Sequence, residues 1–410
     1  MTPFENLSQL PAQNTRLNGR MGMGIWLINR LLNNIDRGQL RVVLPGGGTI
    51  EKSGGSEGSH AVIVLHNWRA IRRLLVNGDI GFAEGFIEND WSTPDLTALI
   101  RFAAQNREAF ARSMRGSPPM RLVNRLAHGL NANTRRGSRR NIEAHYDLGN
   151  EFYRQWLDPS MLYSSAIFDG TTPSLEAAQC KKLERIAEKL QLTGNKSVLE
   201  IGCGWGALAI HLATQHNASV TGITLSPSQL NWAKNAAEKD GKAGRIDLRL
   251  QDYRDVTGQF DNIVSVEMFE AVGEAYWPSY FETLKRCLKP GGRAVLQIIS
   301  IEENRFDTYR RRADFIQKYI FPGGFLPSDS ALEKAIGQAG LKLTETELFG
   351  QSYALTLSEW RQRFHARWQT ISLLGFDDRF RRLWDYYLCY CEAGFAEGTI
   401  NVGLYTIEQG

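Results

Sequence analysis

The sequence has few cysteines, and their spacing does not suggest a cluster. The five are Cys180, Cys203, Cys287, Cys389 and Cys391, an odd number with no CxxC pair. This pattern argues against a disulfide framework and against a cysteine-based zinc site. We therefore expect no metal ion and a reducing, cytoplasmic location.

Long apolar runs are also missing. No stretch reaches the roughly eighteen apolar residues of a membrane-spanning helix, so the sequence predicts no membrane span. The first twenty residues, which include Glu5, Gln9 and Gln13, lack the apolar core of a signal peptide. The net charge of +4 is too small to indicate a partner, and only the distribution of charge is informative.

The first part of the chain predicts a small α+β domain. Short β-like runs at 40–43, 49–52 and 61–65 are separated by glycine clusters, as in a small antiparallel sheet. Helical patterns follow at 68–75 and 95–106. We expect residues 1–111 to form one domain, with a role in lipid or membrane docking or in forming a homodimer.

Residues 112–140 predict an arginine-rich linker. They contain eight arginines, and no acidic residue occurs between Glu108 and Glu143. One interpretation is a solvated linker, since charge runs are usually soluble. The other is peripheral attachment to an anionic membrane surface. Nucleic acid is disfavoured, because no aromatic residues alternate with the arginines for base stacking.

Residues 141–410 predict a second domain of the α/β class. Strand-like and helical patterns alternate, which is typical of parallel strands with crossover helices in a doubly wound sheet. Ligands of such sheets bind beyond the carboxyl ends of the strands. The seven expected strands are 197–201, 219–224, 247–250, 262–266, 293–300, 342–349 and 401–408, the last of them antiparallel.

A glycine turn follows the first of these strands. The apolar run 198–201 leads into Gly202, Gly204 and Gly206, and a helical pattern begins at Ala207. Glycines let a ligand lie against the bare backbone, and a helix N-terminus offers free N–H groups. A plain tight turn is the alternative interpretation.

The spacing indicates which ligand the turn would bind. A dinucleotide fingerprint has G-x-G-x-x-G, whereas this turn has G-x-G-x-G with Glu200 two residues before it. A carboxylate there would repel a pyrophosphate but suits a cationic, amino-acid-like ligand. The turn resembles motif I of the class I S-adenosylmethionine methyltransferases.

Further stretches resemble the cyclopropane-fatty-acyl-phospholipid synthase family, which includes the mycolic acid cyclopropane synthases. They are HYDLGNEFY at 145–153, LYSSA at 162–166, GITLSPSQ at 222–229, QDYRD at 251–255, VSVEMFE at 264–270 and KYIFPGG at 318–324. The resemblance covers 141–410, and more weakly 78–91. It implies methyl transfer from S-adenosylmethionine to the cis double bond of an acyl chain, through a carbocation that loses a proton.

The resemblance also implies a cofactor site. Tyr163 and Ser164 would cap the methionine part, which the three glycines line. The ribose and adenine would be held by Thr224, Leu225, Ser226, Gln229, Asp252 and Tyr253. For Asp252 a turn cap is the alternative role.

In the family the base is a bound bicarbonate, which by resemblance would here be held by Glu270, Tyr353, Ser165, Gln297 and the backbone of Ile299. Ser165 and Gln297 stand where the family has Cys and His, and Ala271 follows Glu270 where His is common. Neither Ser nor Gln supplies a titratable group, so we expect bicarbonate to bind differently or weakly here. The carbocation could then end as a cyclopropane, a methyl branch or an alkene.

Two further residues complete the expected catalytic set. Tyr319 is an aromatic candidate for stabilising the cation. Cys391 matches a cysteine once proposed as a nucleophile in the family, although this chemistry needs no thiolate.

We thus expect an enzyme that methylates unsaturated acyl chains of membrane phospholipids. The alternatives are a methyltransferase acting on a soluble small molecule and a non-enzymatic lipid- or adenosylmethionine-binding protein.

Overall fold

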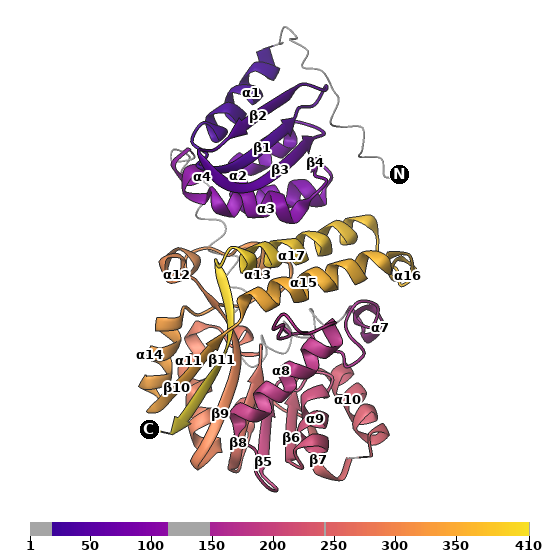
Figure 1. The fold of residues 1–410 in the computed structure, drawn as a ribbon, viewed down its shortest axis with the longest axis vertical. Helices are drawn as coiled ribbons and strands as arrows, with labels where there is room; N and C mark the ends of the chain where they lie inside the picture. The colour runs from indigo at the N-terminus through magenta and orange to yellow at the C-terminus, as the bar shows by residue number, and fades with distance from the viewer. Residues whose placement is uncertain (1–18, 114–147, 242, 410) are drawn as a thin grey trace. The chain divides into compact units, whose positions relative to one another are not determined.

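The computed structural model describes residues 19–113, 148–241 and 243–409, which divide into two compact units (Figure 1). Unit 1 spans Met1–Asn124 and Phe376–Glu397, and unit 2 spans Arg125–Gly375 and Gly398–Gly410. The arginine-rich stretch expected at 112–140 lies, from residue 114 onward, outside the described residues.

Unit 1 is an α+β unit. Its elements are α1 (Gly19–Leu32), β1 (Arg37–Val43), β2 (Thr49–Ser53), β3 (Ser56–Leu65), α2 (Arg69–Ile87), β4 (Trp91–Ser92), α3 (Leu96–Gln105), α4 (Arg107–Ser113) and α17 (Asp378–Ala396).

The sheet of unit 1 is mixed, so the expected antiparallel sheet is wrong in this detail. Its strand order is β2-β1-β3-β4. β1 pairs with β2 in antiparallel and with β3 in parallel orientation. The turn at Gly54 and Gly55 therefore carries the chain from one side of β1 to the other, and β2 and β3 do not form a hairpin.

Helix α17 belongs to unit 1, although its residues lie inside the range 141–410 expected for the second domain. Two side chains of α3 bind its carboxyl-terminal end. The Thr97 hydroxyl donates to Glu392 over 3.0 Å, and the Arg101 Nε donates to Glu397 over 2.6 Å. The predicted second domain therefore does not include α17, which is part of unit 1.

Unit 2 contains the larger sheet. Its elements are α7 (Asn150–Tyr153), α8 (Leu175–Leu190), β5 (Ser197–Ile201), α9 (Ala207–Gln215), β6 (Ser219–Thr224), α10 (Pro227–Lys239), η2 (Ala243–Arg245), β7 (Ile246–Leu250), η3 (Tyr253–Asp255), β8 (Phe260–Val266), η4 (Phe269–Ala271), η5 (Glu274–Tyr276), α11 (Trp277–Cys287), β9 (Leu288–Ile301), α12 (Glu303–Tyr309), α13 (Phe315–Tyr319), α14 (Asp329–Gln338), β10 (Leu341–Leu348), α15 (Gly350–Ala366), α16 (Trp368–Ser372) and β11 (Ile400–Gln409).

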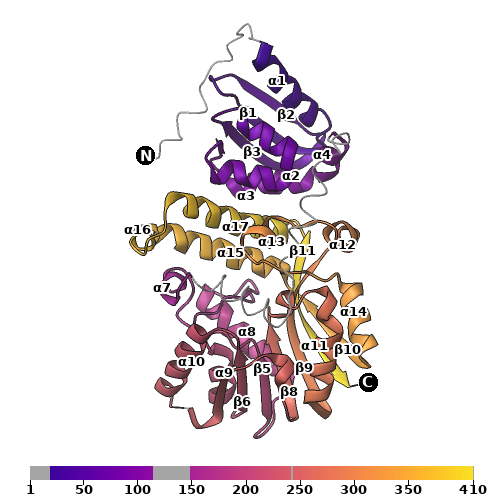
Figure 2. The same cartoon turned by 180° about the vertical axis from the view of Figure 1, so that it is seen from behind.

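The seven strands of unit 2 confirm the predicted doubly wound sheet (Figure 2). Their order is β10-β11-β9-β8-β5-β6-β7. β11 is antiparallel to both of its neighbours, whereas the pairs among β5 to β9 are parallel. From β5 the chain goes to β6 on one side, and β8 lies on the other. The carboxyl ends of β5 and β8 thus form the switch point where ligands of such sheets bind.

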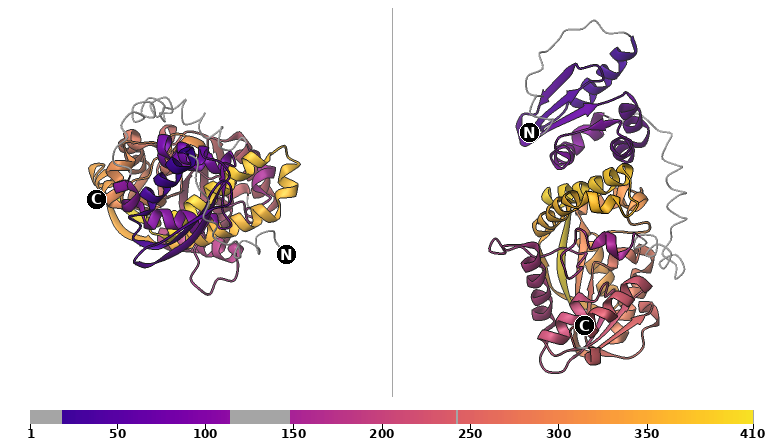
Figure 3. Two further views of the ribbon diagram at one scale, coloured as in Figure 1. Left: turned by 90° about the horizontal axis from the view of Figure 1, so that it is seen from above. Right: turned by 90° about the vertical axis from the view of Figure 1, so that its right-hand side faces the viewer.

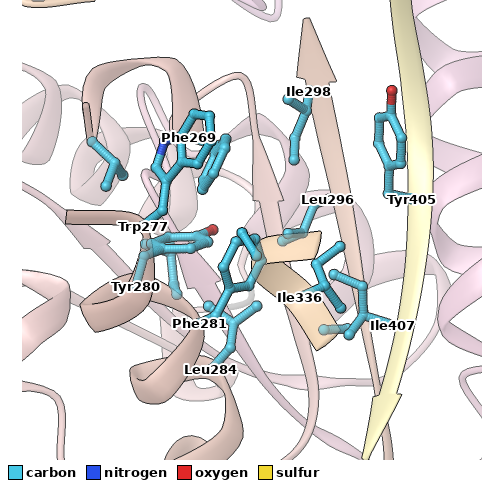
Figure 4. Packing of buried hydrophobic residues seen from close by; sticks show 14 of the residues in the cluster. Phe269, Trp277, Tyr280, Phe281, Leu284, Leu296, Ile298, Ile336, Tyr405 and Ile407 are labelled. Atoms are coloured by element: carbon cyan, nitrogen blue, oxygen red, sulfur yellow. The ribbon is translucent and has the colours of Figure 1, made fainter. Parts of the chain in front are cut away.

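Alternating residues of the central strands pack into two hydrophobic layers, one on each face of the sheet. Val198 of β5 packs with α8, α9 and α10, whereas Leu199 packs with α11 and α14. Figure 4 shows the second layer, in which Phe269, Phe281 and Leu296 lie together. Figure 3 shows helices on both faces of this sheet. The close packing gives the switch point a rigid base.

Among the described helices, none combines the length and the apolar character that crossing a membrane requires.

In unit 1, a buried asparagine joins the end of α3 to the start of β1. The Asn106 Oδ1 accepts from the backbone N–H groups of Asp36 and Arg37, at 2.8 and 3.0 Å. Its Nδ2 donates to the carbonyls of Arg37 and Phe102, at 2.8 and 3.0 Å. One side chain thus satisfies four backbone groups.

We predict that Asn106→Ala destabilises unit 1 by about 2–4 kcal/mol, because buried backbone groups lose their partners. Urea unfolding followed by circular dichroism measures the change. The control is Asn33→Ala at an exposed position, where we expect a change of less than about 0.5 kcal/mol. Equal stability of the two variants would contradict this role for Asn106.

Candidate active site

The glycine turn after β5 leaves one glycine open to a ligand. Gly202, Gly204 and Gly206 all have positive φ, at 86°, 51° and 90°. A Cβ on Gly202 would lie 2.9 Å from Met268, and one on Gly206 would lie 2.9 Å from Ala233. A Cβ on Gly204 would meet nothing within 4 Å. Packing therefore requires the first and third glycines, while the second exposes bare backbone.

Glu200, on β5, carries a buried carboxyl group beside this turn. Glu200 is 4% exposed, and its Oε2 has no hydrogen-bond partner among the described residues. Burial raises its pKa to about 8, against a backbone hydrogen bond from Ala209. An unpaired buried carboxyl group is costly unless something compensates it. A cationic ligand such as S-adenosylmethionine would compensate it, and this role of Glu200 stays a prediction.

The candidate ribose and adenine residues follow β6 and β7. The Thr224 hydroxyl donates to Gln229 Oε1 over 3.0 Å, and Ser226 caps the N-terminus of α10. The side chains of Thr224 and Gln229 are buried, whereas Leu225 is half-buried. They lie at the strand end where the prediction placed them, and their contacts with a nucleoside stay a prediction.

Asp252 has a structural role. Its carboxylate accepts from the backbone N–H of Arg254 and forms an ion pair with the guanidinium of that residue, at 2.6 Å. This is the turn-cap arrangement weighed above as the alternative. Tyr253 packs edge-on against Tyr280, with 5.3 Å between the ring centroids. The adenine contacts of Asp252 and Tyr253 also stay predictions.

The loop 162–168 is tied to two helices. Gln179 and Lys182 of α8 donate to the backbone carbonyl and to the hydroxyl of Ser164, at 3.0 and 2.7 Å. Thr356 and Ser352 of α15 accept from the N–H groups of Ala166 and Phe168. These bonds fix the position of Tyr163, Ser164 and Ser165.

Three of the predicted catalytic residues converge on Glu267, which follows β8. The backbone N–H of Ser165 donates to Glu267 Oε1 over 2.8 Å, and Gln297 Nε2 donates to the same oxygen over 2.7 Å. The Tyr353 hydroxyl donates to Oε2 over 2.6 Å. The backbone of Glu267 has a φ of 49°, a costly conformation for this residue type. The turn therefore holds this carboxylate where three donors meet.

Glu270 lies three residues further on and makes a different contact. Its Oε1 accepts from the backbone N–H of Ile299 over 2.5 Å, and its Oε2 is shielded from water and has no partner among the described residues. The expectation grouped Glu270 and Ile299 with Ser165, Gln297 and Tyr353 around a bicarbonate. The Gln297 and Tyr353 side chains and the Ser165 backbone N–H already bind Glu267, and the Ser165 hydroxyl donates to the carbonyl of Ala166. This arrangement therefore does not fit a bicarbonate held by the same groups.

Burial changes the proton affinity of these groups. It raises the pKa of Glu267, although the donors named above and the charge of Lys182 oppose the rise. Burial, and then the charge of Glu267, raise the pKa of Glu270 to about 8. Lys182 is fully buried, and its pKa falls to about 8, chiefly through burial. Two carboxyls with raised pKa values at one strand end are typical of an acid–base site.

Aromatic rings surround Tyr163. The centroids of Tyr153, Trp156 and Trp360 lie 5.4–5.5 Å from its ring centroid. Phe321, just beyond α13, lies 6.5 Å away. Trp156 and Trp360 are fully buried. The Trp360 ring also lies 6.1 Å from the ring of Tyr353, whose hydroxyl binds Glu267, so this aromatic cluster adjoins the Glu267 site.

The other two predicted catalytic residues are Tyr319 and Cys391. Tyr319 ends α13, where its ring packs on Phe315 at 5.5 Å. Cys391 is on α17, which belongs to unit 1. The catalytic roles of both residues stay predictions.

The sequence prediction omitted four residues of this site, namely Glu267, Lys182, Trp156 and Trp360. Glu267 lies inside the motif VSVEMFE at 264–270, but the sequence prediction gave it no role. A lysine on the apolar face of α8, between Ala178 and Ile186, was a signal that could have identified Lys182.

Comparison with known proteins shows the family to which this chain is similar. The family model described as mycolic acid cyclopropane synthetase matches residues 133–404. Tuberculostearic acid methyltransferase UfaA1 of Mycobacterium tuberculosis is 39% identical over 345 residues, which are 82% of this chain and 80% of that protein. Cyclopropane-fatty-acyl-phospholipid synthase of Escherichia coli is 34% identical over 362 residues, 85% and 88% of the two chains.

A solved structure shares the fold of unit 2. Mycolic acid cyclopropane synthase CmaA1 complexed with SAH and CTAB aligns with a TM-score of 0.62 and 29% identity. The alignment covers 66% of this chain and 97% of that one.

We predict that Gly204→Val weakens S-adenosylmethionine binding by more than about tenfold, because the side chain enters the space where the ligand meets the backbone. Isothermal titration calorimetry measures the affinity. The matched control is Gly194→Val, whose φ of 68° and open surroundings impose a similar backbone cost before β5. Unchanged affinity in the Gly204 variant would place the cofactor elsewhere.

Proposed function

Because the chain belongs to the mycolic acid cyclopropane synthetase family, we propose that it methylates the double bond of an unsaturated acyl chain in a membrane phospholipid, through a carbocation. The family relationship makes it an S-adenosylmethionine-dependent fatty acid methyltransferase or cyclopropane synthase. The phospholipid substrate and the carbocation are our proposal. The observation that supports it is the Glu267 carboxylate, held by three donors close to a cluster of aromatic rings.

The bound S-adenosylmethionine supplies an electrophilic methyl group. The alkene donates its π electrons to that methyl carbon, and a new C–C bond forms as the methyl–sulfur bond breaks. The electron pair of the broken bond stays on the sulfur of the departing S-adenosylhomocysteine, and the positive charge moves to the other alkene carbon. The aromatic rings around Tyr163 stabilise such a cation by about 0.5–2 kcal/mol each when a ring faces it. Burial of Trp156 and Trp360 keeps water, which would quench the cation, away from these rings.

Glu267 is our candidate for the proton acceptor. A carboxylate has about four lone-pair sites. Two on Oε1 are taken by Ser165 and Gln297, and one on Oε2 is taken by Tyr353. One site on Oε2 stays available for the proton that the carbocation loses. The raised pKa of Glu267 brings its proton affinity closer to that of an effective base near neutral pH.

In our proposal Glu267 is the base, the role that the family resemblance gave to bicarbonate. Both are anions, and both would accept hydrogen bonds from Ser165, Gln297 and Tyr353. Glu270, whose pKa of about 8 favours the neutral acid at pH 7, then lies beside Glu267 without adding a second full negative charge. This avoids the repulsion of two adjacent carboxylates.

The net reaction adds CH2 to the acyl chain, whichever proton is lost. Loss from the transferred methyl with ring closure gives a cyclopropane, and loss after a hydride shift gives a methylated alkene. Neither outcome needs an oxidant or a reductant. The relatives named for tuberculostearic acid and for cyclopropane fatty acids represent different product types, so the product needs direct analysis.

The substrate also implies a place of action. A phospholipid double bond lies inside the bilayer, so we propose peripheral contact with an anionic membrane surface from the cytoplasmic side. The arginine-rich sequence at 112–140 supports this through its charge. The apolar stretch 315–326 does not, because Phe315, Ile320 and Phe325 are buried.

Purified protein with methyl-labelled S-adenosylmethionine tests this function. We predict that label enters the acyl chains of dioleoyl phosphatidylglycerol vesicles and not those of distearoyl vesicles, which have no double bond. Gas chromatography with mass spectrometry then separates ring and branched products. Label transfer to free oleate in detergent but not to vesicles would contradict the phospholipid substrate.

We predict that Glu267→Ala lowers turnover by about 10²–10⁴-fold, the usual worth of a general base. Added bicarbonate should restore part of this loss, because Ser165, Gln297 and Tyr353 become free to bind it. The measured quantity is the initial rate of label transfer. The control is Glu274→Ala, in the surface ion pair with Arg310, whose rate should not change or respond to bicarbonate. A Glu267 variant as active as the parent would remove this residue from the chemistry.

A further inference from the structure

Two histidines and a glutamate meet on α8 and α9, outside the site described above. The His211 Nε2 lies 3.0 Å from Glu184 Oε1, and the His216 Nε2 lies 3.2 Å from Glu184 Oε2. The two imidazole rings are 5.6 Å apart between centroids. Glu184 is about half exposed, whereas both histidines are largely covered.

The local backbone brings the histidines together. His211 is in the last turns of α9, and His216 is its C-terminal cap. Asn217 then adopts a left-handed conformation, with a φ of 56°, and the N–H of Ala218 returns to the carbonyl of Leu212. This turn folds His216 back beside His211, and α8 supplies Glu184 from the neighbouring helix.

The Nε2 atoms of His211 and His216 are both shielded from water. Each lies within 3.2 Å of one carboxylate oxygen of Glu184. The ligand atoms of the three residues all lie within 4.8 Å of one another. In a tetrahedral zinc site with bonds of about 2.0–2.1 Å, neighbouring ligand atoms lie about 3.3 Å apart. The two N–O distances are close to that value.

The chemical types of the three side chains are also suitable. Two histidines and one carboxylate, with a fourth position open to water, form a donor set used for zinc in proteins.

We propose that Glu184, His211 and His216 bind one Zn²⁺ ion that joins α8 to α9. The cysteine spacing led us to expect no metal, and this cluster contains no cysteine. The role of the ion is structural, since the buried face of α8 carries Gln179 and Lys182, which hold Ser164. A metal on the outer side of α8 would steady the helix that positions this loop.

The test uses the full chain without a polyhistidine tag, after treatment with chelator and removal of the chelator. Titration with Zn²⁺ by calorimetry, and with Co²⁺ by its visible absorption, should show one bound ion per chain. Glu184→Gln and His216→Ala should each weaken binding by more than about tenfold. Zn²⁺ should raise the Tm of the parent and not that of these variants.

Two control variants separate this site from unrelated binding. His60→Ala removes a histidine in unit 1, and Cys180→Ser removes the exposed thiol one turn before Glu184 on α8. Both should bind Zn²⁺ as the parent does. The proposal is overturned if the parent binds no stoichiometric Zn²⁺, if the two ligand variants bind as the parent does, or if Cys180→Ser abolishes binding. Circular dichroism of every variant confirms that it is folded.

Discussion

The site of unit 2 depends on the hydrogen bonding of one buried carboxylate. Glu267 receives hydrogen bonds from the loop 162–168, from β9 and from α15. The outermost donors, Ser165 and Tyr353, are more than 180 residues apart in the sequence. Burying this group without those donors would be prohibitively costly. The same bonds hold three elements together, so the carboxylate that we propose as the proton acceptor also fixes the positions of Ser165, Gln297 and Tyr353. Its strained backbone at the end of β8 is maintained by this network.

The doubly wound sheet explains why these groups meet. The carboxyl ends of β5 and β8 lie side by side at the switch point, so Gly204 and Glu267 follow neighbouring strands. The tethers from α8 and α15 to the loop 162–168 bring Tyr163 and its aromatic neighbours to this edge. A few hydrogen bonds within an otherwise apolar core therefore fix the residues of the candidate site to the sheet and its helices.

Much of the fold could be predicted from the sequence because its signals are local. Apolar runs separated by helical patterns identified the seven strands, and the glycine turn marked the end of β5. The strand order inside unit 1 and the partner of α17 could not be predicted, because both depend on contacts between segments far apart in the chain. Ser165, Gln297 and Tyr353 were identified by resemblance, but their common partner was not. An acidic side chain in place of a bound anion leaves no periodic signal, whereas Lys182 did leave one through its position on the apolar face of α8.

The central claim is that Glu267 supplies the anion that relatives are expected to take from solution. The most direct measurement is the initial rate of methyl transfer by the unaltered protein in sealed buffer freed of carbon dioxide, with and without added bicarbonate. The account predicts equal rates, because the three donors are already engaged by Glu267. A rate that collapses on removal of carbon dioxide and returns with bicarbonate would contradict it.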